Sequence, residues 1–142
     1  MTILLPIDLT DPSRELTAVA EAIKQHKAFG GELHLLTVVP EFNNKLFQVL
    51  YADNVGEQAV EHVKKLLEKF CQKYLPAEIT YQTHIETGIV YKEILQKAKQ
   101  INANLIVITA SRPELADYLM GPNTGKVVRH SQCSVLVVRQ DD

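Results

Sequence analysis

The sequence predicts an α/β protein built on a five-stranded parallel sheet with helices on both faces. Short apolar runs of strand length alternate with segments of helical periodicity along the whole chain. The runs at residues 3–5 and 105–109 are continuously apolar, which is typical of strands buried on both faces. Alternation of this kind gives parallel strands joined by right-handed crossovers. We therefore predict a single domain over residues 1–142.

Turn and cap residues bound the expected elements. Pro6 interrupts pairing near the end of the first strand because it lacks an N–H group. Gly30 and Gly31 stop the first helix, and Pro76 closes the second. The expected strands are 2–8, 32–39, 79–86, 105–109 and 134–138, and the expected helices are 11–29, 56–75, 91–101 and 123–130.

The patterning also predicts the order of the strands. The third strand alternates apolar and polar residues, as expected at an exposed edge, whereas the first and fourth are apolar and belong in the middle. The strand order 3-2-1-4-5 satisfies both conditions. Residues 41–55, between the second strand and the second helix, are too many for a tight turn and include aromatic residues. We predict that they form a flap folded over a ligand.

Composition excludes several classes of function. The net charge of −2 gives no basic surface for nucleic acid. No apolar stretch approaches the ~20 residues of a membrane-spanning helix, and the first residues lack the pattern of a signal peptide. Because Cys71 and Cys133 have no pairing spacing, we predict two free thiols in a cytoplasmic protein without a membrane partner.

The strand order predicts where a ligand binds. In open parallel sheets, ligands bind beyond the carboxyl ends of the strands, at the point where the strand order reverses. Here that point lies between the first and the fourth strand. The residues expected to meet there are Pro6, Ile7, Asp8, Ala110, Ser111 and Arg112.

Each polar residue at this point has two interpretations. Asp8 is suited to accept hydrogen bonds from ribose hydroxyls, and equally suited to cap the following helix. Arg112 matches phosphate oxygens in a bidentate manner, or it is a solvated loop arginine. The segment 121–124 is either an anion site at a helix start or a plain glycine turn with a polar cap. Their convergence on one edge favours an anion or nucleotide-phosphate site.

Motifs for other chemistries do not occur in the sequence. The five histidines are scattered over predicted helices and strands without the spacing of a metal site. There is neither a nucleophile elbow nor a GxxxxGK[ST] phosphate loop. No catalytic and no metal-binding residue can therefore be named, and any nucleotide hydrolysis is expected to be slow at most.

Three stretches of the chain resemble the universal stress protein family. They are the start ILLPID, the strand LHLLTVV, and the tail from ITASRP through GPNTGKVVRHSQCSVLVVR. The resemblance extends over the whole chain in length and element order. It implies a Rossmann-like fold of the adenine nucleotide alpha hydrolase type. It also implies that Asp8 contacts adenosine and that the main chain of Val38 meets the adenine base.

The phosphate-binding segment departs from the family's signature G-x2-G-x9-G-[ST]. Ala110 and Pro113 stand where the first two glycines would be, Gly121 follows after too few residues, and Pro122 replaces the serine or threonine. Prolines lack the N–H groups that would cradle phosphate, so the chain resembles a subgroup with a short SxRP loop. The side-chain donors expected to replace them belong to Ser111, Arg112, Asn123 and Thr124.

The resemblance implies an adenine-nucleotide-binding regulatory protein of the stress response, with ATP, ADP or AMP as ligand and Mg²⁺ arriving only with the nucleotide. It also implies a homodimer, with the pairing of dimers into tetramers left open. The apolar margin strand at 135–138 is a template for pairing with a second copy. Its interface residues are Val135, Leu136, Val137 and Val138. The alternative is a nucleotide-free interaction module with the same fold and dimer.

Overall fold

The computed structural model describes residues 1–40, 55–110 and 122–140, in which strands and helices alternate. The flap predicted over residues 41–55 falls outside them except for Val55. The strands are β1 (Thr2–Pro6), β2 (Glu32–Pro40), β3 (Tyr81–Gly88), β4 (Leu105–Thr109) and β5 (Ser134–Val138). A 3₁₀ turn, η1 (Pro12–Glu15), precedes α1 (Leu16–Phe29), and the other helices are α3 (Val55–Tyr74), α4 (Val90–Gln100) and α5 (Pro122–His130).

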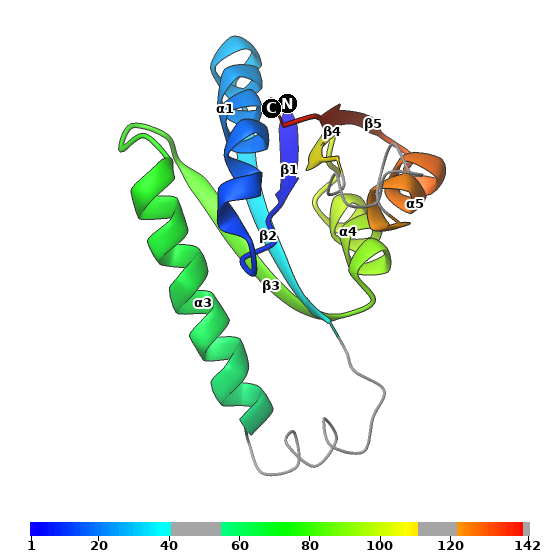
Figure 1. The fold of residues 1–142 in the computed structure, drawn as a ribbon. Helices are drawn as coiled ribbons and strands as arrows, with labels where there is room; N and C mark the ends of the chain where they lie inside the picture. The colour runs from blue at the N-terminus through cyan, green and yellow to red at the C-terminus, as the bar shows by residue number, and fades with distance from the viewer. Residues whose placement is uncertain (41–54, 111–121, 141–142) are drawn as a thin grey trace.

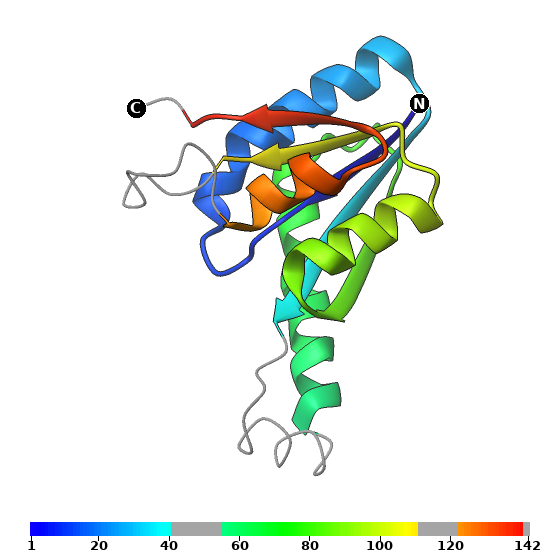
Figure 2. The ribbon, with the colours of Figure 1, turned by 90° about the vertical axis from the view of Figure 1, so that its right-hand side faces the viewer.

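The sheet is parallel, and its strand order confirms the prediction. The order is β3-β2-β1-β4-β5, so the first strand of the chain lies at the centre. Helices α1 and α3 cover one face, and α4 and α5 cover the other (Figure 1). Figure 2 looks onto the face that α4 and α5 cover, with α1 and α3 behind the sheet.

Continuously apolar strands are required because both faces of the sheet are covered. Alternate residues of β1 point to opposite faces, with Ile3 and Leu5 packed in the cluster beneath α1 and α3. Leu4 packs in the cluster beneath α4 and α5. All three side chains are fully buried. A strand with one polar face could not occupy this central position without burying unpaired polar groups.

The boundaries of three strands differ from the expected ones, and β2 does so by a single residue, at Pro40. The first strand ends at Pro6, not at residue 8, so Asp8 lies in the loop beyond it. The third begins at Tyr81 instead of residue 79, because the N–H of Ile79 donates to the carbonyl of Pro76 and closes a turn. Ile79 is nevertheless buried in the core, and its apolar character made it look like part of the strand.

The glycine pair after α1 is required by the backbone. Gly30 has a φ of 68° and its N–H donates to the carbonyl of His26 at 2.7 Å, which ends the helix. Gly31 has a φ of 92°, and a Cβ there would overlap the main chain of Met1. The predicted helix stop is therefore also the place where the chain passes close to its own first residue.

A buried polar cluster lies where β2 and β3 pair. His34 is 3% exposed, and its Nδ1 lies 2.8 Å from Nε2 of His84, so one of these nitrogens carries the shared proton. Nε2 of His34 lies 3.2 Å from a Glu32 carboxylate oxygen. Burial, and then the positive charge of Lys97, lower the pKa of His84. This contact is not predictable from the sequence, because the two residues are fifty positions apart.

Two further expectations concern thiols and membranes. Cys71 and Cys133 are both unpaired. Burial raises the pKa of the Cys71 thiol to about 11, which suits a core residue rather than a reactive one. None of the helices in the described ranges is long and apolar enough to cross a bilayer.

Replacing Leu5 with alanine tests the central position of β1. The side chain is 0% exposed, and truncation leaves a cavity between two tightly packed layers. We expect a loss of about 2–5 kcal/mol in the free energy of unfolding, measured by urea denaturation. The control is Phe29→Ala, since Phe29 is 63% exposed at the end of α1. A similar loss in both variants would contradict this description of the core.

Candidate functional site

A cavity of about 700 Å³ opens at the carboxyl ends of the strands. This volume is within the range of small-molecule sites. The ends of β1, β2 and β4, the first residues of α4, and one side of α3 line it. The predicted site residues among its walls are Pro6, Ile7, Asp8, Val38, Ala110, Asn123 and Thr124. Ser111, Arg112 and Gly121 lie outside the described residues, as does the side chain of Pro122.

The cavity exists because the two central strands diverge. The β1–β4 ladder is short, with Ile3 opposite Leu105 and Leu4 opposite Ile106. Beyond it, the N–H of Ile7 donates to a carbonyl of β2 at 2.8 Å. The N–H of Ala110 donates to a carbonyl of β5 at the same distance. Each strand end therefore stays with its outer neighbour, which leaves the crevice expected where the strand order reverses.

The Glu15 carboxyl fills the inner end of this crevice. It is only 7% exposed, although it belongs to a charged residue in a surface turn. Its Oε2 accepts a hydrogen bond of 2.9 Å from the hydroxyl of Thr109, at the end of β4. The main-chain N–H of Asp8, just past β1, also donates to this carboxyl. Glu15 thus joins the ends of the two strands that have separated.

The sequence predicts no role for Glu15 in the site. The signal that could have identified it is helical periodicity. Glu15 precedes Ala18, Val19 and Ala22 at spacings of three, four and seven, and all three are buried against the sheet. An acidic residue in register with a buried face is unusual, and it requires hydrogen-bonding partners there.

Burial gives the Glu15 carboxyl an unusual proton affinity. Removal from water raises its pKa from 4.5 to about 7, and the negative charges of Asp8 and Asp11 act in the same direction. The hydrogen bonds from Thr109 and from the Asp8 main chain oppose the shift but do not cancel it. The group therefore exchanges its proton near neutral pH.

The structure shows that Asp8 organises its own loop while it lines the cavity. Oδ1 of Asp8 accepts bonds from the Thr10 N–H at 2.9 Å and from the Thr10 hydroxyl at 2.6 Å. This is an Asx-type turn, and it differs from the helix cap that the sequence left open as the alternative, because the residue at the cap position of η1 is Asp11. Asp8 is exposed, and its second oxygen takes no part in these two bonds. A role in the turn is thus compatible with a role in ligand binding.

Two threonine hydroxyls on the cavity wall donate to the main chain. Thr37 donates to the carbonyl of Ile7 at 3.1 Å, and Thr124 donates to the carbonyl of Thr109 at 3.0 Å. The second bond fastens the start of α5 to the end of β4. Because the Thr124 proton is engaged, this side chain is a weaker candidate donor for phosphate than the exposed Asn123.

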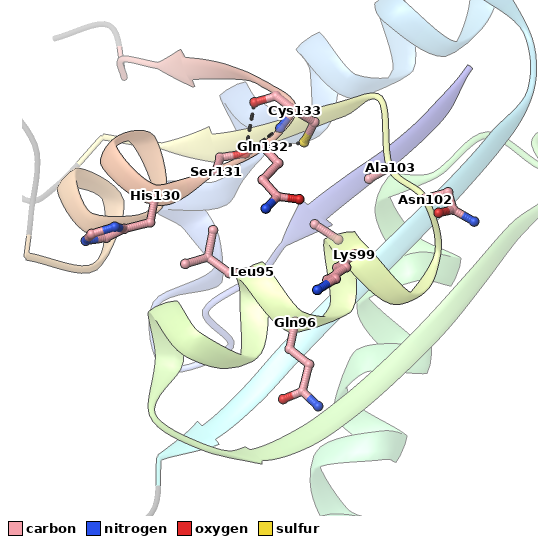
Figure 3. Close-up of a pocket in the computed structure, with 10 residues that line it drawn as sticks. Leu95, Gln96, Lys99, Asn102, Ala103, His130, Ser131, Gln132 and Cys133 are labelled. Carbon is pink, nitrogen blue, oxygen red and sulfur yellow. Dashed lines mark hydrogen bonds between the residues drawn. The ribbon is translucent and has the colours of Figure 1, made fainter.

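A second hollow, of about 520 Å³, lies at the amino ends of β4 and β5 (Figure 3). It is bounded by the last residues of α4 and α5, with Asn102 and His130 at its two ends. Ser131 and Cys133 bond to each other there instead of presenting free groups. The carboxyl ends of α4 and α5 disfavour anions here, whereas the start of α5 lies at the wall of the 700 Å³ cavity.

No metal centre is found among residues 1–40, 55–110 and 122–140, since no three His, Cys, Asp or Glu side chains there are grouped to hold an ion. The contact between His34 and His84 supplies two imidazoles only. The described part of the site therefore consists of apolar side chains, hydroxyls, one amide and the charged groups around η1.

Replacing Glu15 with glutamine tests the buried carboxyl. A folded-state pKa above the unfolded value means that the folded protein holds the proton more tightly, so this contribution to stability falls as the pH rises from about 4.5 to about 7. Between pH 5 and pH 8 the loss for wild type should be on the order of 2 kcal/mol, and Glu15→Gln should lack it. Urea denaturation at both pH values measures the difference.

The control for this comparison is Glu21→Gln on α1, the helix that follows Glu15. Glu21 pairs with Lys24 at 3.1 Å near the surface, and its pKa is lowered by that contact. Its variant should keep the wild-type loss of stability between pH 5 and pH 8. Equal pH dependence of wild type and Glu15→Gln would show that Glu15 ionises as an ordinary carboxyl.

Comparison with known proteins identifies relatives along the whole chain. The profile of the universal stress protein family matches residues 1–139. Universal stress protein G of Escherichia coli O157:H7 is 29% identical, over 97% of this chain and 98% of that protein. Universal stress protein A homolog 1 of Coxiella burnetii is 25% identical, over 96% of this chain and 94% of that protein.

Solved structures have the same fold. Universal stress protein UspA from Lactobacillus plantarum has a TM-score of 0.78 at 25% identity, over 98% of this chain and 97% of that chain. A universal stress protein in complex with cAMP has a TM-score of 0.68 at 20% identity, over 97% and 95%. The profile match, the relatives and the shared fold agree with one another, and this chain belongs to the universal stress protein family.

Proposed function

We propose that this protein is a cytoplasmic regulatory protein of the stress response that binds an adenine nucleotide. The observation that carries the proposal is the cavity where β1 and β4 diverge, with an exposed carboxylate at its rim and apolar walls inside. Such a site suits a ligand with a flat apolar base and a hydroxyl-bearing sugar. The universal stress protein in complex with cAMP supports this choice of ligand class.

The base and the sugar have separate partners in this proposal. The adenine base lies against the end of β2, where the main chain of Val38 supplies hydrogen bonds and the partly exposed Val39 and Val90 supply apolar surface. The ribose hydroxyls donate to Asp8, through the carboxylate oxygen that the Thr10 bonds do not use. Hydrogen bonds to a charged acceptor contribute about 1.5–3 kcal/mol each.

The phosphates lie toward the start of α5. The first turn of this nine-residue helix offers main-chain N–H groups and the positive end of its dipole. Asn123 adds an exposed amide on the cavity wall. In this proposal the phosphate-binding part of the site also includes Ala110, Ser111, Arg112, Gly121 and Pro122, and Arg112 supplies the positive charge. Mg²⁺ would be held mainly by the phosphates of ATP.

Calorimetric titration of nucleotide-free protein tests the proposal, with AMP and with ATP plus Mg²⁺. We expect saturable binding, and a loss of about tenfold or more in affinity for Asp8→Ala, because the ribose hydroxyls lose a charged acceptor. Asp8→Asn keeps an oxygen for the Thr10 bonds and should lose less. Preference for AMP over 2′-deoxy-AMP should disappear in Asp8→Ala.

A control variant separates the site from general charge effects. Glu78 is exposed in the turn before β3, at the amino edge of the sheet, and Glu78→Ala should bind like wild type. Absence of any binding to folded wild-type protein would refute the nucleotide function and leave the second candidate.

The second candidate is a nucleotide-free dimeric interaction module. The observation that favours it is the position of β5 at the margin of the sheet, with half-buried apolar side chains at residues 135–138. An uncovered apolar margin is a template for strand pairing. Antiparallel pairing of β5 with a second copy would give an isologous dimer, and this dimer is part of both candidate functions.

Replacing Val137 with lysine tests the dimer. A charge on the partly buried face of β5 should prevent pairing and give monomers in analytical ultracentrifugation, whereas wild type should sediment as a dimer. Ile89→Lys is the matched control, because Ile89 is an apolar residue that is 50% exposed and follows β3 at the opposite margin. A Val137→Lys protein that still dimerises would place the interface elsewhere.

A further inference from the structure

The cavity wall is acidic on the side where the two central strands separate. The charged side chains among its described lining residues are Asp8, Asp11, Arg14 and Glu15. Asp11 and Arg14 pair at 2.6 Å, so the arginine is already balanced by one carboxylate. The lining residues described from β2, α3, α4, β4 and α5 carry no titratable side chain. An anionic ligand therefore meets the carboxyls of Asp8 and Glu15.

Glu15 differs from the other carboxyls by its position. Asp8 is exposed and Asp11 is partly exposed, so water screens their charges. Glu15 is 7% exposed, and its hydrogen bonds from Thr109 and from the Asp8 N–H hold it in the crevice. Protonation removes the repulsion between its charge and that of a ligand.

We propose that Glu15 couples nucleotide binding to proton uptake, an inference that rests on the nucleotide function proposed above. When an anionic nucleotide enters the cavity, the Glu15 carboxyl takes up a proton from solvent. The site then binds nucleotide more tightly as the pH falls. Protonation at Oε1 leaves Oε2 able to accept the Thr109 bond, so the link between the strand ends survives the change. The nucleotide itself is not chemically altered.

Two physical effects drive this uptake. The bound ligand excludes water from the cavity, which further disfavours a charged carboxyl. The phosphate charge adds repulsion in a space of low dielectric constant. Ligand-free Glu15 has a pKa of about 7, so a small rise in this pKa is enough to change its protonation at neutral pH. If binding raises the pKa of Glu15 by about one unit, the affinity for nucleotide is about fivefold higher at pH 6 than at pH 8.

The test is calorimetry with AMP at pH 6, 7 and 8, at each pH in two buffers with different ionisation heats. The buffer dependence of the heat gives the number of protons taken up. We expect wild type to take up more protons at pH 7 and 8 than Glu15→Gln, and to lose about fivefold more affinity between pH 6 and pH 8. Protonation of AMP itself is common to both proteins and cancels. Adenosine, which lacks the phosphate, should give a smaller uptake.

Glu21→Gln is the matched control, and it should take up protons like wild type. Equal uptake by wild type and Glu15→Gln, with AMP bound by both, overturns the proton linkage and leaves the nucleotide function intact. Absence of AMP binding by wild type at every pH overturns both. If Glu15→Gln does not fold, the carboxyl ¹³C signal of Glu15 in wild type decides the question. Its titration midpoint must rise when AMP binds, and an unchanged midpoint refutes the proposal.

Discussion

The separation of β1 from β4 is the constraint on which the rest of this structure depends. A parallel sheet whose strand order reverses must leave a gap between the two central strands, because their following segments turn to opposite faces. Here the gap is closed at its base by one carboxyl that bonds to both strand ends. The main-chain N–H groups just beyond β1 and β4 donate hydrogen bonds to β2 and β5, not to each other. The space between the two strand ends is therefore left for side chains and a ligand.

Much of the fold could be predicted from the sequence because its signals are local and agree with one another. The continuous apolar runs of β1 and β4 require two covered faces, and the alternation in β3 requires an edge. The strand order follows from these two conditions. Boundaries were less accurate at residue 79, where a buried apolar side chain belongs to a turn. Burial and strand pairing are separate properties, and hydropathy reports only the first.

The site could be predicted in part. The cavity is lined by several residues that the sequence predicts: Asp8, Val38, Ala110, Asn123 and Thr124. They could be predicted because the ends of strands are easy to locate in the sequence. Glu15 was missed because its meaning depends on Thr109, which is 94 positions away. The role of Thr124 also changed, since its hydroxyl proton goes to the carbonyl of Thr109. Which hydrogen-bonding groups remain for a ligand depends on contacts between distant segments, and a single sequence does not display them.

The central position of β1 has a consequence for synthesis of the protein. During synthesis, β1 can pair with β2 soon after it is made, whereas its other edge stays unpaired until β4 is made, about a hundred residues later. The N–H of Thr2 bonds to Asn104, which fixes that late contact at the start of both strands. Until then, an apolar strand edge is open to pairing with other chains. A nascent chain of this topology therefore depends on rapid completion, or on chaperones, more than one whose first strand lies at a margin.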